Sequence, residues 1–453
     1  MTGRGRRGGV GERWRALWRR SVDATAGKKV QEFATGAWLM LVGVALGLVV
    51  ALLTTAVPAA LDDPNDLEKG TVVVLSGLDD SGQRADLIAQ WNALHEDTQA
   101  KILELPAIAD AQRSEMLARA QAGGGGVDVY NLDVTWTAEF AAAGHLHSLD
   151  ESRVRTDGFL PRPLSTCRYD GKLWALPFNT DVGLLYYNTE LIKRVGRTVP
   201  PSSWGGLVDD SVEIAGVTNG ATAGYVGQFA DYEGLTVTAL EMVWGADGVV
   251  VDDEGAVLPD PRDVSAVRTA FGRIKTIART LPPTNEATSI EEFRKGRALY
   301  MRNWPVAYRT LNDPERGPVP PFAVAALPGG TGALGGQNLA VSATTDMPKA
   351  SRALVEFLTD ARSQQQLFQR GGLPATRSVV YKDPQVQSRL TDVLFTALTS
   401  ARSRPVEPHY ASFSRALRAE VDAYVVRDLG IVDGDLRDRL TAALDGREPP
   451  RPT

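Results

Sequence analysis

Three tryptophans lie close to carboxylate or amide side chains at places where strands or helices are expected to end. Trp136 follows Asp133 just beyond one expected strand, Trp304 follows Asn303 at the end of another, and Trp244 lies near the end of a helix. An indole face suits the apolar C–H face of a sugar, whose hydroxyl groups need carboxylate or amide partners. These residue types predict a carbohydrate site. The alternative is that each tryptophan is a core residue.

Three other patterns point to chemistry that the rest of the chain does not support. Residues 330–335 match G-x-G-x-x-G, but the sequence after them alternates like a strand, whereas a dinucleotide fingerprint opens a helix. His145 and His147 would face the same side of a strand, yet four histidines and one cysteine favour a turn over a metal site. Cys167 has no histidine base nearby in sequence, so a buried thiol is expected. We therefore expect no cofactor and no metal.

Catalysis is an alternative because two acids that flank a glycosidic bond can hydrolyse it. Asp133 and Asp181 are the candidates. No nucleophile or acid–base motif distinguishes them from the other acidic residues, so we expect a binding site and not an enzyme.

The elements that must position these side chains alternate along the chain. Apolar, β-branched strands are expected over residues 71–77, 100–106 and 127–133, with helices over 83–97 and 110–122 between them. This order predicts an α/β domain with a parallel, doubly wound sheet. Ligands of such sheets collect beyond the carboxyl ends of the strands, where Asp133 lies.

The N-terminal part has a different composition. No charged residue occurs over 34–61, and the apolar run is long enough to cross roughly 30 Å of hydrocarbon as a helix. Nine Arg or Lys residues precede it, and an acidic segment follows. The positive-inside rule then places the N-terminus in the cytoplasm and the chain after residue 62 outside. A cleaved signal peptide is the alternative, and the length of the basic segment favours a retained anchor.

Length and charge set further bounds. A chain of 453 residues predicts two domains or three, and a net charge of −6 gives no electrostatic reason to bind nucleic acid. One cysteine excludes an intrachain disulfide framework.

Five ordered blocks resemble the extracellular solute-binding proteins of ABC transporters, in particular the maltose/trehalose-type sugar binders. The similarity covers nearly all of residues 70–430. Its blocks are "VDVYNLDVTWTAEFAAAGHLHSLDE", "YDGKLWALPFNTDVGLLYYNTELIKRVGRTVPPSSWGGLV", "FRKGRALYMRNWPVA", "LPGGTGALGGQNLAVSATTDMPKASRALVEFLTDARSQQ" and "RPVEPHYASFSRAL".

The resemblance implies which residues contact the ligand. Carboxylates and amides would bond hydroxyl groups, tryptophans would stack on sugar rings, glycines would let the backbone approach, and an arginine would donate a charge-assisted bond. The implied contacts are Asp133, Trp136, Asn179, Asp181, Trp244, Trp304, Gly335, Gly336 and Arg377, with Asp79, Asp80 and Asn303 as weaker assignments.

The resemblance also implies a two-lobe periplasmic-binding-protein-like fold of type II, here after one N-terminal transmembrane helix. The expected parts are a basic cytoplasmic segment 1–35, a membrane helix 36–61, a linker 62–70, a first lobe of 71–180 plus about 331–378, and a second lobe of 181–330 plus about 379–453.

The expected role is delivery of an oligosaccharide to a permease at the cell membrane by hinge closure. Many relatives carry a lipid on a cysteine after the signal, and no cysteine lies near residue 60 here. A membrane helix would replace that lipid. Alternatives are an anchored carbohydrate sensor or adaptor without a transport role, and a secreted carbohydrate-active enzyme.

Overall fold

The computed structural model describes residues 38, 40–48, 66–252, 254–278, 283–386, 389–449 and 452. Residues 67–453 form one compact unit, and the N-terminal part forms another. The basic segment 1–35 and most of the predicted membrane helix and linker lie outside the described residues. Among the residues that the structure describes, no helix is long and apolar enough to span a bilayer.

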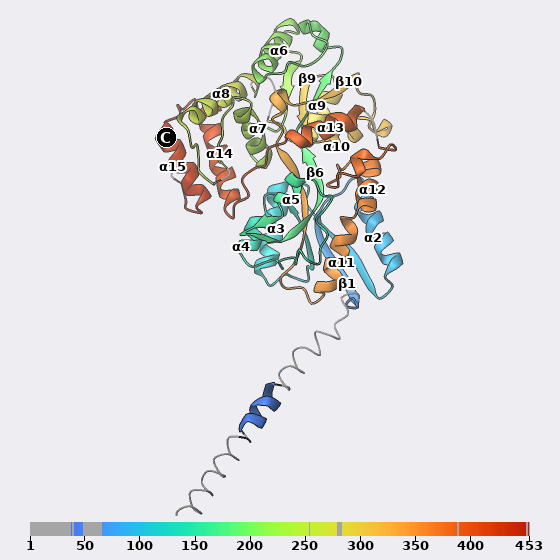
Figure 1. The fold of residues 1–453 in the computed structure, drawn as a ribbon. Coiled ribbons are helices and arrows are strands. Elements are labelled where there is room, and N and C mark those ends of the chain that lie inside the picture. Colours follow the sequence, from blue (N-terminus) through green and yellow to red (C-terminus); the bar gives the residue numbers. More distant parts are fainter. Residues whose placement is uncertain are drawn as a thin grey trace, which may run out of the picture. The chain divides into compact units, whose positions relative to one another are not determined.

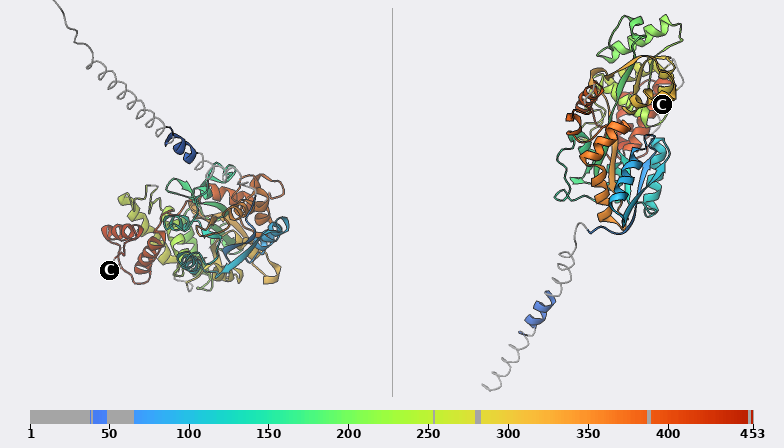
Figure 2. Two further views of the ribbon diagram at one scale, coloured as in Figure 1. Left: turned by 90° about the horizontal axis from the view of Figure 1, so that it is seen from below. Right: turned by 90° about the vertical axis from the view of Figure 1, so that its right-hand side faces the viewer.

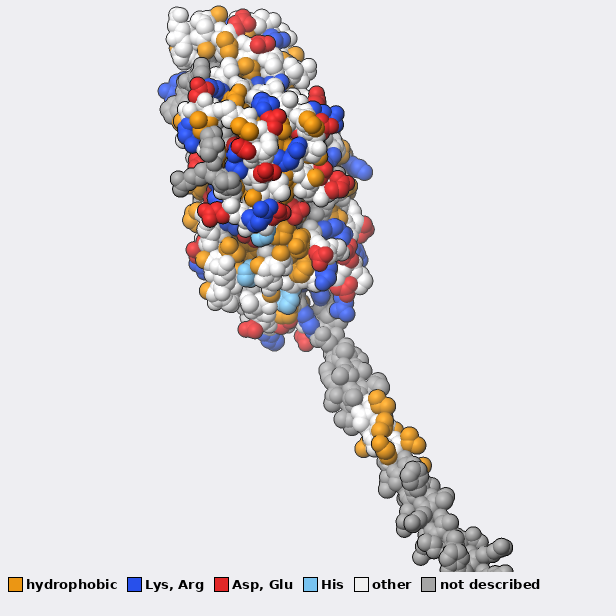
Figure 3. Space-filling model, turned by 90° about the vertical axis from the view of Figure 1, so that its left-hand side faces the viewer, with side chains coloured by type: hydrophobic (Ala, Val, Ile, Leu, Met, Phe, Trp, Pro, Cys, Tyr) orange, Lys and Arg blue, Asp and Glu red, His pale blue; other side chains and the backbone are white. Residues whose placement is uncertain are grey.

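The described piece of the predicted membrane helix is helical over residues 40–48. Its apolar side chains are exposed, Met40 by 75% and Leu41 by 68%, and they appear as an apolar patch in Figure 3. Such exposure is unusual for large apolar side chains of a soluble unit.

The first lobe is built on a five-stranded sheet with the strand order β2-β1-β3-β11-β6 (Figure 1). Its strands are β1 (Gly70–Gly77), β2 (Thr98–Leu105), β3 (Val129–Asp133), β6 (Ala175–Val182) and β11 (Leu334–Val341). The strands predicted from β-branched runs are present, and β1 pairs in parallel with β2 and β3. The expectation of an all-parallel sheet was wrong, because β11 runs antiparallel to β3 and β6.

Helices cover this sheet and bury its apolar side chains. They are α2 (Gln83–Leu94), α3 (Ala109–Gln121), α4 (Thr137–Ala142), α5 (Pro161–Ser165), α11 (Pro348–Leu358) and α12 (Ala361–Gly371), and a small hairpin of β4 (Arg168–Tyr169) and β5 (Lys172–Leu173) lies beside them. Trp91 of α2 is 2% exposed and packs in this core, and its indole nitrogen donates to the Thr98 carbonyl at 2.8 Å.

The second lobe contains a four-stranded sheet with the order β10-β7-β9-β8. Its strands are β7 (Leu184–Asn188), β8 (Ala223–Val226), β9 (Ala298–Asn303) and β10 (Phe322–Ala326). Its helices are α6 (Trp204–Val217), α7 (Glu233–Trp244), α8 (Pro261–Ile277), α9 (Glu286–Arg294), α10 (Val306–Leu311), α13 (Arg389–Ser400), α14 (Tyr410–Val425) and α15 (Asp433–Leu444), with short 3-10 turns at Ile192–Val195, Pro314–Arg316, Pro328–Gly330 and Val380–Lys382. Within residues 67–453 the two lobes are visible one above the other in both Figure 1 and the right-hand view of Figure 2.

The chain crosses between the two lobes three times, from β6 to β7, from β10 to β11 and between α12 and α13. β6 passes into β7 through Gly183, whose N–H donates to the Ala333 carbonyl at 3.4 Å. The backbone N–H of Arg402, in the loop between α13 and α14, donates to the Gly332 carbonyl at 2.9 Å, and the Arg402 carbonyl accepts from the Leu334 N–H at 2.8 Å, so this loop runs beside the second crossing. The first predicted limit between the lobes, after residue 180, therefore falls inside β6, and the strand changes sheet at Gly183.

Candidate ligand-binding cleft

A cleft of about 590 Å³ lies between the two lobes, beside the crossing segments. Six of the residues predicted as ligand contacts line it. These are Asp133, Trp136, Asp181, Trp304, Gly335 and Gly336. They come from β3 and the turn after it, from β6 and β11, and from the residue that follows β9, so residues far apart in sequence meet at one surface.

The first lobe contributes Asp133 and Trp136 from the end of β3 and the turn before α4. The Asp133 carboxylate accepts bonds from the Thr135 N–H at 2.9 Å and the Thr135 hydroxyl at 2.8 Å, which fixes the turn. Trp136 is 6% exposed, so most of its indole packs in the lobe while one part lines the cleft. The strand–turn–helix expected from the sequence is therefore what positions this pair.

Two glycines of β11 form part of the cleft floor. Gly336 has a φ of 119°, and an added Cβ would lie 2.2 Å from the Asn179 carbonyl oxygen, so only glycine fits there. A Cβ on Gly335 would lie 3.0 Å from the Trp304 ring and 3.2 Å from the Asp181 Cβ. The missing side chains let Trp304 and Asp181 come close to each other across the strand.

Asp181 is the most perturbed acid of the cleft. One carboxylate oxygen accepts from the Asn179 amide at 3.2 Å, and the other is buried without a hydrogen-bond partner among the described residues. Burial raises the pKa of Asp181 to about 7, and the negative charge of Asp133 adds to that rise, while the guanidinium groups of Arg84 and Arg302 oppose it. Such a carboxylate requires a donor from elsewhere, which a ligand in the cleft can supply.

Trp304 forms the second lobe's aromatic wall. Its indole nitrogen donates to Glu286 at 3.3 Å, and the Tyr232 hydroxyl donates to the other oxygen of Glu286 at 2.6 Å. The Arg302 guanidinium lies 3.8 Å from the centre of the Trp304 ring. Asn303 does not line the cleft, because its amide donates to the Glu286 carbonyl and the Ser289 hydroxyl, each at 3.0 Å.

Arg404 and Glu233 were not predicted as site residues, and they connect the lobes. The Arg404 side chain is only 2% exposed, and it donates to Glu233 at 2.7 Å and to Asp133 at 3.1 Å. These two carboxylates raise the pKa of Arg404, although burial alone would lower it. Tyr410 and Ser414 also donate to Glu233. Arg404 opens the last block that resembles the family, but no sequence pattern places Glu233 beside it.

Gln337, Tyr232 and Glu286 also line the cleft without having been predicted. The Gln337 amide oxygen accepts from Arg84 at 2.6 Å and from Asn131 at 3.0 Å. The residues in these contacts lie far apart in the sequence, so the spacing of residues along the chain could not predict them.

The structure does not bring the other predicted residues to this cleft. Trp244 is 6% exposed and packs in the core of the second lobe. Arg377 donates to the carbonyls of Thr359 and Asp157, each at 2.9 Å, and its guanidinium lies over the Phe159 ring. Asp79 caps the start of α2 through the Arg84 N–H at 2.9 Å. Asp80 lines an adjoining groove, and the Asn179 amide donates to the Asp181 carboxylate.

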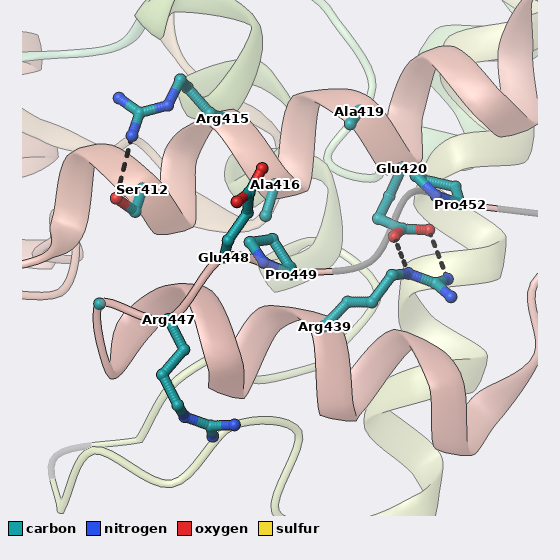
Figure 4. Close-up of a pocket in the computed structure, with 11 residues that line it drawn as sticks. Ser412, Arg415, Ala416, Ala419, Glu420, Arg439, Arg447, Glu448, Pro449 and Pro452 are labelled. Atoms are coloured by element: carbon teal, nitrogen blue, oxygen red, sulfur yellow. Dashed lines mark hydrogen bonds and ion pairs between the residues drawn. The ribbon is translucent and has the colours of Figure 1, made fainter.

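The adjoining groove at Asp80 is larger, about 1080 Å³, but none of the six predicted contacts above lines it. A cavity of about 460 Å³ between α14 and α15 is lined by the ion pair of Glu420 and Arg439, and none of the predicted residues lies there (Figure 4). Cys167 is fully buried, which raises the pKa of its thiol. Within the described part of the chain, no group of three or more His, Cys, Asp or Glu side chains could hold a metal ion. The Gly-rich turn at 330–335 leads into β11, as predicted, and not into a helix.

Comparisons with known proteins agree with this architecture. Residues 87–392 match the family described as bacterial extracellular solute-binding protein. A probable ABC transporter-binding protein of Deinococcus radiodurans is 33% identical over 321 residues, which cover 67% of this chain and 76% of the relative.

Two solved structures have the same fold. The maltose-bound MalE3 of T. maritima is 27% identical, with a TM-score of 0.70 over 83% of this chain and 99% of that one. An ABC transporter solute-binding protein from Thermotoga lettingae, bound with α-D-tagatose, is 19% identical, with a TM-score of 0.71 over 83% of this chain and 98% of that one, and its likeness concerns the fold alone. The resemblance predicted from the sequence is confirmed, and this chain belongs to the bacterial extracellular solute-binding proteins of ABC transporters.

Proposed function

We propose that the cleft binds a sugar and that the protein delivers it to an ABC transporter permease without catalysis. The observation that carries this proposal is the placement of Trp136, Trp304 and Asp181 on one cleft surface between the lobes. Indole rings cover apolar sugar faces, and the unpartnered carboxylate oxygen of Asp181 needs a hydroxyl donor. The maltose bound to the T. maritima relative supports the same ligand class.

Hinge bending at the crossing segments provides the mechanism. Asp133 on the first lobe and Glu233 on the second both bond Arg404, so the cleft brings charged groups of the two lobes together. A sugar that contacts Trp136 and Trp304 touches both lobes and stabilises the closed arrangement. The closed form is the one proposed to dock on the permease.

Isothermal titration tests the binding proposal. Residues 67–453 form a compact unit, so this part of the chain is titrated with maltose, trehalose and a panel of other mono- and oligosaccharides. Heat of binding for at least one sugar is expected. Absence of binding across the whole panel refutes the proposal, and turnover of a bound sugar, followed by chromatography, refutes the non-catalytic role.

We also propose that residues 36–61 anchor the protein as a retained, single membrane-spanning helix with the lobes outside the cell. The uncharged run of 34–61, the basic residues before it and the exposed apolar side chains of the described piece support this role. Mass spectrometry of the protein from membranes tests it. A mature chain that begins near residue 60 refutes retention.

The long basic N-terminus motivates a second candidate, a sensor that reports ligand through the membrane helix. Deletion of residues 1–30 with the anchor kept separates the two roles. Sugar uptake that survives the deletion intact supports the transport role over the sensor role.

A further inference from the structure

The cleft contains more negative than positive charge. Arg404 is bonded to two carboxylates, those of Asp133 and Glu233, and can neutralise one of them. Asp181 and Glu286 also line the cleft, and neither has a Lys or Arg nitrogen within ion-pair distance in the described part of the chain. Carboxylates that line a low-dielectric cleft without a counter-ion attract a cation more strongly than they would in water.

The Glu286 carboxylate is held by two neutral donors. Tyr232 donates through its hydroxyl at 2.6 Å, and Trp304 donates through its indole N–H at 3.3 Å. These bonds orient the carboxylate and leave its charge in place, and they set two aromatic rings beside it. The Arg302 guanidinium near the Trp304 ring makes its ion pair with Glu241, at 2.7 Å, and makes none with Glu286 among the described residues.

Asp181 lies near the Trp304 ring, because a Cβ added at Gly335 would come within 3.2 Å of both side chains. Its buried oxygen has no partner among the described residues. The nearby cation Arg84 donates its hydrogen bonds to neutral groups, the Ser76 hydroxyl at 2.9 Å and the Gln337 amide oxygen at 2.6 Å. An aromatic ring beside two such carboxylates is an arrangement that binds ammonium groups, chiefly through charge.

We propose that the cleft prefers a ligand with a positive charge, an amino sugar or another polyhydroxylated amine, over the neutral sugar of the same shape. The ammonium group lies at Trp304 between Asp181 and Glu286, and the hydroxyl groups bond the remaining acceptors. This inference rests on the proposed sugar-binding function and narrows its ligand class. Ligands with a carboxylate or phosphate at the same position are repelled.

Matched sugars test the preference. Residues 67–453 are titrated at about pH 8 with glucose, galactose and mannose, each compared with its 6-amino-6-deoxy analogue and its uronic acid. A primary alkylammonium stays protonated there, as a lysine does. In at least one triplet the amine is expected to bind about tenfold more tightly than the hydroxyl compound, and the uronic acid more weakly than both.

Two isosteric variants assign the effect to the named side chains. In Asp181→Asn and Glu286→Gln the ratio of the two dissociation constants, neutral sugar to amine, is expected to fall toward one. Glu151→Gln is the matched control, since Glu151 pairs with Arg168 on the surface of the first lobe and leaves the ratio unchanged. The ratio is measured on folded, ligand-competent protein, so a loss of stability alone does not change it.

The outcomes separate this inference from the function on which it rests. Neutral sugars that bind as tightly as their amines overturn the charge preference and leave sugar binding intact. Amines whose advantage survives both substitutions overturn the assignment to Asp181 and Glu286. If no member of the triplets and no sugar of the wider panel binds, both proposals fail.

Discussion

Removing one charge of the buried ion pair between Arg302 and Glu241 is expected to lower the free energy of unfolding by a large amount. Both side chains are fully buried behind Trp304, and Glu241 accepts two bonds from the Arg302 guanidinium, at 3.0 and 2.7 Å. Glu241 also accepts from the Ala333 N–H at 2.9 Å, on a segment that crosses between the lobes. The pair therefore lies where the lobes are joined.

Glu241→Gln keeps the size of the side chain and removes its charge. Arg302 cannot escape the resulting penalty by losing its proton, because a guanidinium stays charged in proteins. Breaking a buried pair by removing one partner costs about 3–5 kcal/mol of unfolding free energy. Gly183 packs against the pair so closely that a Cβ would lie within 2.8 Å of Arg302, so a rearranged arginine has little space to move into.

Urea denaturation followed by tryptophan fluorescence measures the loss. Glu151→Gln breaks an ion pair with Arg168 whose side chains are 38% and 42% exposed, and its expected cost is only about 0–1 kcal/mol. The comparison isolates the effect of burial. A Glu241→Gln variant that loses less than about 1 kcal/mol, no more than the surface control, would show that the charge is not held in a low-dielectric site.

Three further changes test the cleft. Trp304→Ala is expected to weaken binding of the best sugar by roughly 1–3 kcal/mol through lost apolar burial, and an unchanged titration isotherm argues against stacking at this ring. Gly335→Val pushes a side chain into the space between Trp304 and Asp181 and should abolish ligand binding in the same titration; Gly216→Ala, where an added Cβ meets nothing within 4 Å, is its control, and retained binding by the valine variant contradicts the proposed floor. Burial raises the pKa of Asp181 to about 7, so the folded state holds a proton that the unfolded chain releases near the ordinary pKa of 3.8, and the ligand-free protein loses stability as the pH rises between these values. The melting temperature of Asp181→Asn should therefore exceed that of the wild type by more at about pH 8 than at about pH 5. Equal differences at the two pH values would mean that burial does not raise the pKa of Asp181.

Local patterns in the sequence were enough to predict many elements. Alternating and β-branched runs predicted β1, β2 and β3, and the helical stripe around Trp91 predicted α2, because strand and helix periodicities are properties of a few neighbouring residues. The turn after β3 was equally local, and Asp133 and Trp136 line the cleft, while their contact with a ligand stays a prediction.

Pairings between distant segments could not be read in this way. β11 comes back from the second lobe and joins the first sheet in the antiparallel direction, which no local pattern records. The same limit applies to Trp244, whose position at a helix end resembled that of Trp136, but which α7 directs into the core of the second lobe. Proximity to an element end predicts where a backbone turns and does not predict which face a side chain meets.

By itself the sequence determined the alternation of strands and helices, the apolar N-terminal run and the family, since each depends on residues close together in the chain or on ordered blocks. Only the tertiary structure decided which charges share the cleft. Arg404 lies 271 positions from Asp133 and 171 from Glu233, and their contact exists because the loop between α13 and α14 runs beside the second crossing segment. Burial and charge balance are properties of that three-dimensional arrangement, so the electrostatic character of the site appears only once the lobes are folded.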